Sequence, residues 1–105
     1  MKRNQLNRGV VSRIMYVENK DGDIDGAVAR VGYVQFSKSG LTVYYRGRKL
    51  KRARGVRGNH VDLETGDEYW ISGVKKSGSN AHWAESVKYI VDEEAVSEYQ
   101  KARKD

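Results

Sequence analysis

Short runs of hydrophobic residues alternate with polar ones along most of the chain, and glycines separate the runs. The clearest run is 41–45, in which Leu41, Val43 and Tyr45 are predicted to point inward from a strand. Side chains of a strand alternate between its two faces, so a period of two is typical of a half-buried β-strand. Further runs rich in β-branched and aromatic residues predict strands over 10–18, 28–36, 60–63, 67–74 and 87–91.

Three glycines indicate where the backbone departs from a regular strand. Gly32 lies in the middle of a predicted strand and indicates either a bulge or a close backbone approach. Gly66 is expected in the left-handed conformation of a short hairpin loop. At Gly47 the alternation fails, because Leu50 is out of phase with Tyr45. Either the strand ends there or a one-residue bulge begins at Gly47, and a glycine beside a phase break favours the bulge.

The C-terminal residues follow a helical pattern, which predicts a helix over about 92–104. Asp92 is expected to cap its first turn, where the helix dipole also favours the acids that follow. Val91, just before this cap, can pack on Val96. A helix of about twelve residues is marginal alone, so it must pack on the sheet.

The order of elements, short strands and then one helix, predicts a mainly β fold. We expect a small antiparallel SH3-like barrel, or a curled sheet of about five to six strands, closed or flanked by the C-terminal helix. Residues 1–9 are predicted to form a flexible basic N-terminus, and residues 10–105 a single domain.

The composition limits the classes of protein and of site. Of the 105 residues, 38% are hydrophobic and 32% are charged, so the core must be small. The absence of cysteine excludes disulfides, thiolate metal sites and cysteine nucleophiles, and it fits a reducing compartment. The basic N-terminus has no apolar run behind it, and no stretch approaches the roughly 18 apolar residues of a membrane span. These features predict a soluble, cytoplasmic protein with no membrane partner.

Positive charge is concentrated in one segment, 46–57, which we call the basic strip. It contains seven Lys or Arg residues and no acid, and without them the formal net charge of +6 would become −1. The next segment, 58–70, contains no Lys or Arg and four acids: Asp62, Glu64, Asp67 and Glu68. Two interpretations remain open, because the strip could bind a polyanion or pair with these acids across a hairpin.

The chemistry of the basic strip suits a nucleic acid. Lys and Arg along an extended segment neutralise successive phosphates and release counterions, and five arginines on a single strand predict a log–log salt slope of about −3.5. Arginine binds phosphate through two hydrogen bonds, and an exposed ring such as Tyr45 or Trp70 would stack on bases. We therefore predict a small non-catalytic module that binds RNA or single-stranded DNA. The candidate residues are Arg46, Arg48, Lys49, Lys51, Arg52, Arg54, Arg57, Lys75, Lys76, Tyr45 and Trp70.

The alternative is a protein-interaction or self-associating module. Its basic and acidic segments would pair between chains, and an exposed Trp70 or Trp83 would anchor the contact. Trp70 alternates with Tyr69 and Ile71, so it either points outward as an exposed ring or lies packed beneath the C-terminal helix.

Metal and catalytic sites find weaker support. Residues 21–26 copy the first half of a calcium-binding loop, but Gly32 stands where the loop requires a bidentate glutamate, so we interpret them as an acidic turn. The remaining candidates, which show no helical ligand spacing, are His60, His82, Asp62 and Glu85. We predict no catalytic residue, no metal and no cofactor.

Several segments are distinctive enough to compare with known proteins. They are residues 31–40, 44–47 (YYRG) and 62–76 (DLETGDEYWISGVKK), with 82–84 and 91–93 towards the C-terminus. These segments resemble a family of small bacterial proteins. The resemblance implies one structural unit over residues 31–94; it supplies no established function and no catalytic residues.

Overall fold

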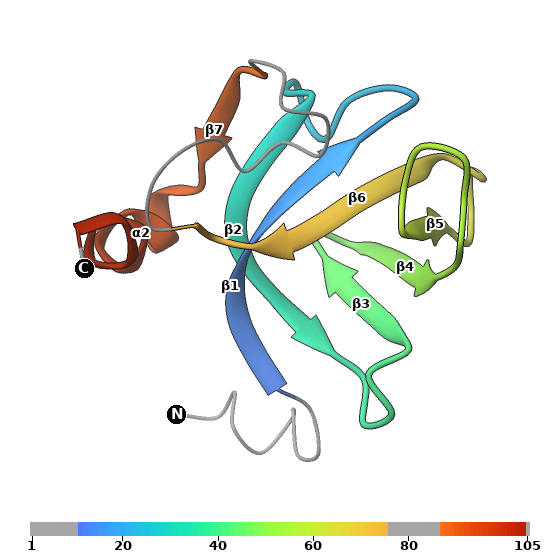
Figure 1. Ribbon diagram of the computed structural model, residues 1–105, viewed down its shortest axis with the longest axis horizontal. Helices are drawn as coiled ribbons and strands as arrows, with labels where there is room; N and C mark the ends of the chain where they lie inside the picture. Colours follow the sequence, from blue (N-terminus) through green and yellow to red (C-terminus); the bar gives the residue numbers. More distant parts are fainter. Residues whose placement is uncertain (1–10, 76–86, 105) are drawn as a thin grey trace.

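The computed structural model describes residues 11–75 and 87–104, and in these residues six antiparallel strands form a closed barrel with a seventh strand and a helix outside it (Figure 1). The predicted mainly β fold with one C-terminal helix is therefore confirmed. The elements are β1 (Val11–Asn19), β2 (Ala29–Phe36), β3 (Thr42–Tyr45), β4 (Arg48–Arg52), β5 (His60–Asp62), β6 (Glu68–Gly73), β7 (Tyr89–Val91), the short 3₁₀-helix η1 (Glu93–Ala95) and α2 (Val96–Lys104).

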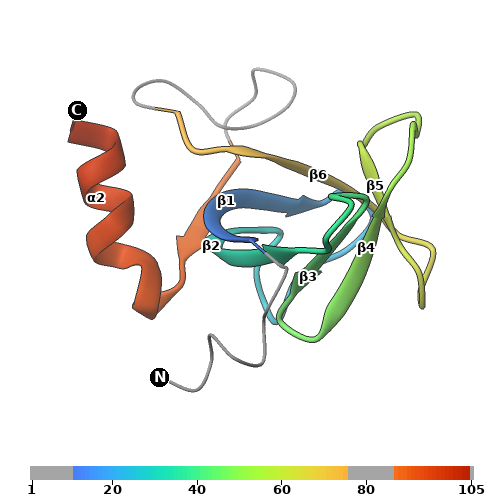
Figure 2. The same ribbon diagram turned by 90° about the horizontal axis from the view of Figure 1, so that it is seen from below.

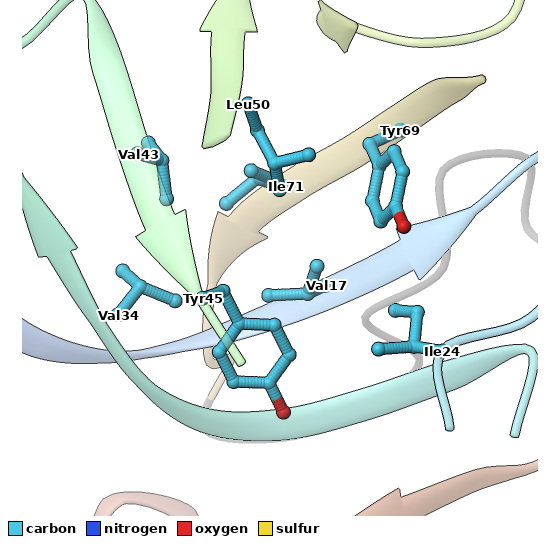
Figure 3. Close-up of a cluster of buried hydrophobic side chains, with 8 residues drawn as sticks. All are labelled: Val17, Ile24, Val34, Val43, Tyr45, Leu50, Tyr69 and Ile71. Carbon is cyan, nitrogen blue, oxygen red and sulfur yellow. The ribbon is translucent and has the colours of Figure 1, made fainter. Parts of the chain in front are cut away.

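Each barrel strand pairs with the next one along the chain, and β1 also pairs with β6, which closes the sheet. Closure removes the unpaired edges that an open sheet would present. One face of every strand points into the barrel, where a continuous apolar cluster forms (Figure 3). Its buried members are Val17, Ile24, Val34, Val43, Tyr45, Leu50, Tyr69 and Ile71.

A second apolar cluster lies outside the barrel, between β1, β2 and the C-terminal elements. Tyr16, Ala29 and Val31 are buried at its centre. Trp70 of β6 and Tyr99 of α2 pack against them, and the ring of Tyr16 meets that of Tyr89 edge to face. The helix thus covers only one side of the barrel, opposite β4 and β5 (Figure 2). The expectation that it must pack on the sheet is confirmed.

The last strand differs from the antiparallel pattern of the other six. β7 pairs with β2 in parallel, with Ala29 opposite Tyr89 and Val31 opposite Val91. Parallel strands need a long connection, and here β3, β4, β5 and β6 all lie between β2 and β7 in the chain. Alternation along a strand does not reveal the direction of its partner, so the antiparallel pattern expected from the sequence did not include this parallel pair.

The phase break at Gly47 is a tight turn, so the predicted bulge is wrong. β3 ends at Tyr45 and β4 begins at Arg48, directly opposite it. Between them Arg46 and Gly47 both have positive φ, 46° and 82°, as a two-residue hairpin loop requires. Leu50 therefore faces Val43 inside the barrel.

Asp92 does not cap a helix, contrary to prediction. Its side chain makes no capping hydrogen bond. Instead the buried carboxylate accepts hydrogen bonds from Arg30 Nη1 at 2.9 Å and from the Tyr45 hydroxyl at 2.5 Å. The residue thereby ties the C-terminal elements to β2 and to the barrel interior.

The prediction for Gly66 is confirmed, whereas Gly32 forms no bulge and is approached by side chains rather than by backbone. Gly32 has no room for a side chain, since a Cβ there would collide with the Asp92 carboxylate and lie 2.9 Å from the Tyr45 hydroxyl. Gly66 has a φ of 82° in the loop that joins β5 to β6. Leu41, by contrast, precedes β3 and is exposed rather than inward.

Candidate nucleic-acid interface

Two lysines of β4 point away from the barrel. Leu50 is buried inside, so Lys49 and Lys51 on either side of it face solvent. Their cross-strand neighbours carry no charge: Tyr44 lies opposite Lys49, and Thr42 and Val61 lie opposite Lys51. Pairing within the sheet therefore leaves both ammonium groups available to a ligand.

Two further cations lie at the end of β4: Arg52 is its last residue, on the strand face opposite to Lys51, and Arg54 follows in the loop. The chain turns back after Arg52, and backbone hydrogen bonds from Ala53 to Asn59 and from Gly55 to Gly58 hold the returning loop. A hollow of about 370 Å³ opens here. Its lining residues are Arg52, Ala53, Arg54, Gly58 and Asn59. Two guanidinium groups and polar backbone beside an open hollow suit a phosphate.

The basic strip does not act as one surface, because three of its arginines form ion pairs with Asp21 or Asp25 of the acidic turn, residues 21–26. Arg46 Nε lies 2.6 Å from one carboxylate oxygen of Asp25, and Arg48 Nη2 lies 3.1 Å from the other. Arg57 forms an ion pair with Asp21. Hydrogen bonds from Arg46 and Arg48 lower the pKa of Asp25 to about 2, so Asp25 is ionised at neutral pH.

The acids of the neighbouring hairpin do not neutralise the strip, although that was the alternative interpretation. The Asp62 carboxylate accepts hydrogen bonds from the backbone of Glu64 and Thr65, at 2.8 and 3.2 Å. Glu68 accepts from the backbone of Arg57 and Gly58. Among residues 11–75 and 87–104, neither these two acids nor Glu64 and Asp67 form an ion pair with the strip. In the same residues, four strip cations form no ion pair: Lys49, Lys51, Arg52 and Arg54.

The two rings proposed to stack on bases are not available for it. Tyr45 is buried in the barrel with its hydroxyl on Asp92. Trp70 points outward, as its alternation with Tyr69 allows, but it packs into the cluster beneath α2. The packed interpretation of Trp70 is therefore the correct one, and Tyr45, although opposite Arg48 of β4, points into the barrel.

A further exposed ring, not among the candidate site residues, lies beside the lysines. Tyr44 is 37% exposed on the outer face of β3. The alternation that placed Val43 and Tyr45 inward already required Tyr44 to face outward. Its position directly opposite Lys49 could also be read from a correctly placed hairpin turn.

Other candidates lie away from this surface or outside the described residues. Lys75 follows β6, and its carbonyl accepts a hydrogen bond from Arg103 of α2, so it belongs to the helix side. The remaining candidates, Lys76, Trp83, His82 and Glu85, fall outside the described residues. Within those residues no cluster of acidic and histidine side chains could hold a metal ion.

His60 is a buried structural histidine. Asn59 fixes its tautomer: the Asn59 side chain forms two hydrogen bonds with the Ile71 backbone, which orients its oxygen towards His60 Nδ1, 2.8 Å away. That nitrogen must therefore donate. Burial, with the nearby Arg52 charge, lowers the pKa of His60 to about 4, so the ring is neutral at pH 7.

The longest helix in the described residues is α2, whose nine residues are too few and too polar to cross a bilayer. No family model, no curated protein and no solved structure matches this chain, so the family resemblance of its sequence segments stays a prediction.

Proposed function

We propose that this protein is a small non-catalytic module that binds nucleic acid. The observation that supports the proposal is the group of four exposed cations on β4 and the loop after it, which have no acidic partner in the described part of the chain. We call this group the β4 cation surface. It consists of Lys49, Lys51, Arg52 and Arg54.

The phosphate backbone is the ligand group that this surface fits best. Each Lys or Arg that neutralises a phosphate releases counterions, and this release supplies affinity without reading a sequence. Arg52 and Arg54 can each hold a phosphate oxygen pair through the planar fork of the guanidinium, beside the hollow that they line. The two lysines contribute point charges along β4.

The test is a salt titration followed by fluorescence anisotropy, using a labelled oligothymidylate. Four phosphate contacts on a single strand predict a slope of log affinity against log salt of about −2.8, less steep than five arginines would give. The variant Arg52→Ala/Arg54→Ala removes two contacts and is expected to reduce the slope by about 1.4.

The matched control is Lys88→Ala/Lys101→Ala, which removes the same charge from exposed positions at β7 and α2. It is expected to keep the steep slope. A slope near zero for the unaltered protein would remove the proposal, and equal losses in the two double variants would show that only net charge matters.

A second candidate is self-association, which one feature favours. Among the described strands β7 is the outermost and pairs only with β2, and Ile90 on it is 48% exposed. An unpaired strand edge is a template for a second chain. Sizing chromatography without nucleic acid, at low and high salt, separates the candidates: a salt-resistant dimer favours self-association, and a monomer favours the nucleic-acid proposal.

A further inference from the structure

Two tyrosines lie together on the outer surface of the barrel, next to the β4 cation surface. Gln35 of β2 pairs with Tyr44 of β3, and Tyr33 lies two residues before Gln35 on the same outer face. Tyr33 and Tyr44 are thus diagonal neighbours across two strands. Backbone positions related in this way are usually roughly 7–8 Å apart, within reach of aromatic side chains. They are 38% and 37% exposed.

The environment of the two rings leaves them free to contact a ligand. The Tyr33 hydroxyl donates to Glu98 of α2 at 3.1 Å, which restrains the ring without covering it. Tyr44 is flanked by Lys49 across the hairpin, on the side away from Tyr33. An aromatic platform therefore borders Lys49 and Lys51 on the same outer face, and the hollow at Arg52 and Arg54 lies at the end of β4 beyond them.

This arrangement matches the two parts of an unpaired nucleic-acid strand. A base stacked on an exposed ring contributes about 1–3 kcal/mol of binding free energy whatever its sequence, while a groove of cations follows the backbone. The bases of a duplex already stack on one another, so a duplex can use the cations but not the rings. The rings would therefore discriminate between the two forms.

The acidic side of α2 limits the length of the site. Partial burial and the hydrogen bond to Glu98 raise the pKa of Tyr33, and the charge of Glu94 acts in the same direction. A phosphate placed beyond Tyr33 would meet these two carboxylates. The platform therefore has an electrostatic end at α2 and an open end towards β4.

We propose that the site selects single-stranded nucleic acid over duplex, with adjacent bases stacked on Tyr33 and Tyr44 and the phosphates on the β4 cation surface. This proposal rests on the proposed function. It adds a ligand form, two contact residues and a short footprint near the lower end of the range of about 4–16 nucleotides for single-strand-binding barrels.

The experiment compares an eight-nucleotide oligothymidylate, an eight-base-pair duplex and inorganic polyphosphate at one salt concentration. Tyr44→Leu is expected to weaken binding of the single strand roughly 5- to 100-fold, since one stacked base is lost. Binding of the duplex and of polyphosphate should not change. Tyr44→Phe keeps the ring and should bind like the unaltered protein.

Tyr89→Leu is the matched control, because this tyrosine is equally exposed but lies on β7. It should not alter binding of the single strand. If the single strand and the duplex bind equally well and Tyr44→Leu has no effect, the stacking proposal fails while the proposed function stands. If no oligonucleotide binds with a steep salt dependence, both fail.

The footprint has its own readout, the salt slope against oligonucleotide length. The slope should stop steepening at about four to five nucleotides, once the four cations are occupied. A slope that continues to steepen up to twelve nucleotides would overturn the short footprint and place further phosphate contacts elsewhere on the molecule.

Discussion

At Gly32 the sequence marks an unusual position in a strand but does not identify the residues that contact it. A glycine within a run of strand-forming residues indicated a bulge or a close backbone approach. The structure instead contains a close approach of two side chains, the Asp92 carboxylate and the Tyr45 hydroxyl. The sequence could not name Asp92, because a residue 60 positions away enters the site only through the parallel pairing of β7.

Gly32→Ala should therefore be far more harmful than an ordinary substitution in a strand. The added methyl group must displace a buried carboxylate that Arg30 and Tyr45 hold, so we expect a loss of about 2–3 kcal/mol or more in the free energy of unfolding. Urea denaturation of the purified variant measures it.

Gly73→Ala is the control for this prediction. Gly73 ends β6, has no atom within 4 Å of an added Cβ and has no positive φ. A change within about 0.5 kcal/mol is expected there, as for other surface positions. Similar losses at Gly32 and Gly73 would mean that the collision is relieved at little cost.

The mistakes at single residues have one physical origin. Asp92 precedes a helical segment, which favours a cap locally, but a buried Arg30 competes for the same carboxylate. Tyr45 was placed inward by alternation and also proposed to stack, and these two roles exclude each other for a ring in the barrel. Local pattern predicts the face of a strand well, whereas the partner of a charge depends on the closed fold.

At the level of elements, the hairpin of β3 and β4 explains both the phase break and the division of the basic strip. Two-residue loops usually contain Asn-Gly or Asp-Gly, so Arg46-Gly47 gave no usual signal. Arg46 has a positive φ, which is uncommon for such a residue. Its guanidinium group is held by Asp25, so the acidic turn and the hairpin stabilise each other.

Asp25 therefore forms ion pairs with two arginines of the basic strip, which keeps their charge from a ligand on the β4 cation surface. Asp25→Asn removes its charge while keeping a side chain that tolerates the φ of 51°. Arg48 is then released, whereas Arg46 keeps a second ion pair with the buried Asp92 at 3.5 Å, so we expect tighter binding to the oligothymidylate and a salt slope steeper by about 0.7. The anisotropy titration described above measures both.

Asp23→Asn makes the same change two residues earlier in the same turn, at an exposed side chain. It is expected to leave the slope unchanged. Thermal melting of both variants checks that the hairpin still folds. Equal slopes in the two variants would show that Arg48 does not reach the ligand even when released.

At the level of the whole molecule, the sequence predicted the class of fold because it depends on two local patterns. These are the alternation of hydrophobic and polar residues and the glycines that separate the strands. Most strands, most inward faces and the final helix follow from these patterns, but β4 was merged with β3 and Leu41 was placed inward. Two features do not follow from them: the pairing of β1 with β6 and the direction of β7. Both join residues that are far apart in sequence, and they decide which acids reach the basic strip. The charge pattern was visible, but its division into paired and unpaired cations was not.

The stability of the whole molecule should fall as the pH drops from about 6.5 to 4. The buried His60 has a pKa of about 4, whereas an unfolded histidine titrates near 6.5, so in this window the unfolded chain binds a proton that the folded one refuses. The full effect is about 3 kcal/mol of unfolding free energy. His60→Gln, which can still donate to Asn59, should flatten this part of the profile in urea titrations at successive pH values.

A second acid loss is expected at lower pH and has a different source. Asp25 has a pKa of about 2 and Asp21 a lowered one, so the stability they contribute is present above their ordinary value of 3.8 and is lost below it. His60→Gln should leave this lower loss intact, while Asp25→Asn should weaken it and leave the upper window unchanged. If both variants altered the same window, the two groups would be coupled, and the separate assignment of His60 to the barrel and Asp25 to the hairpin would be wrong.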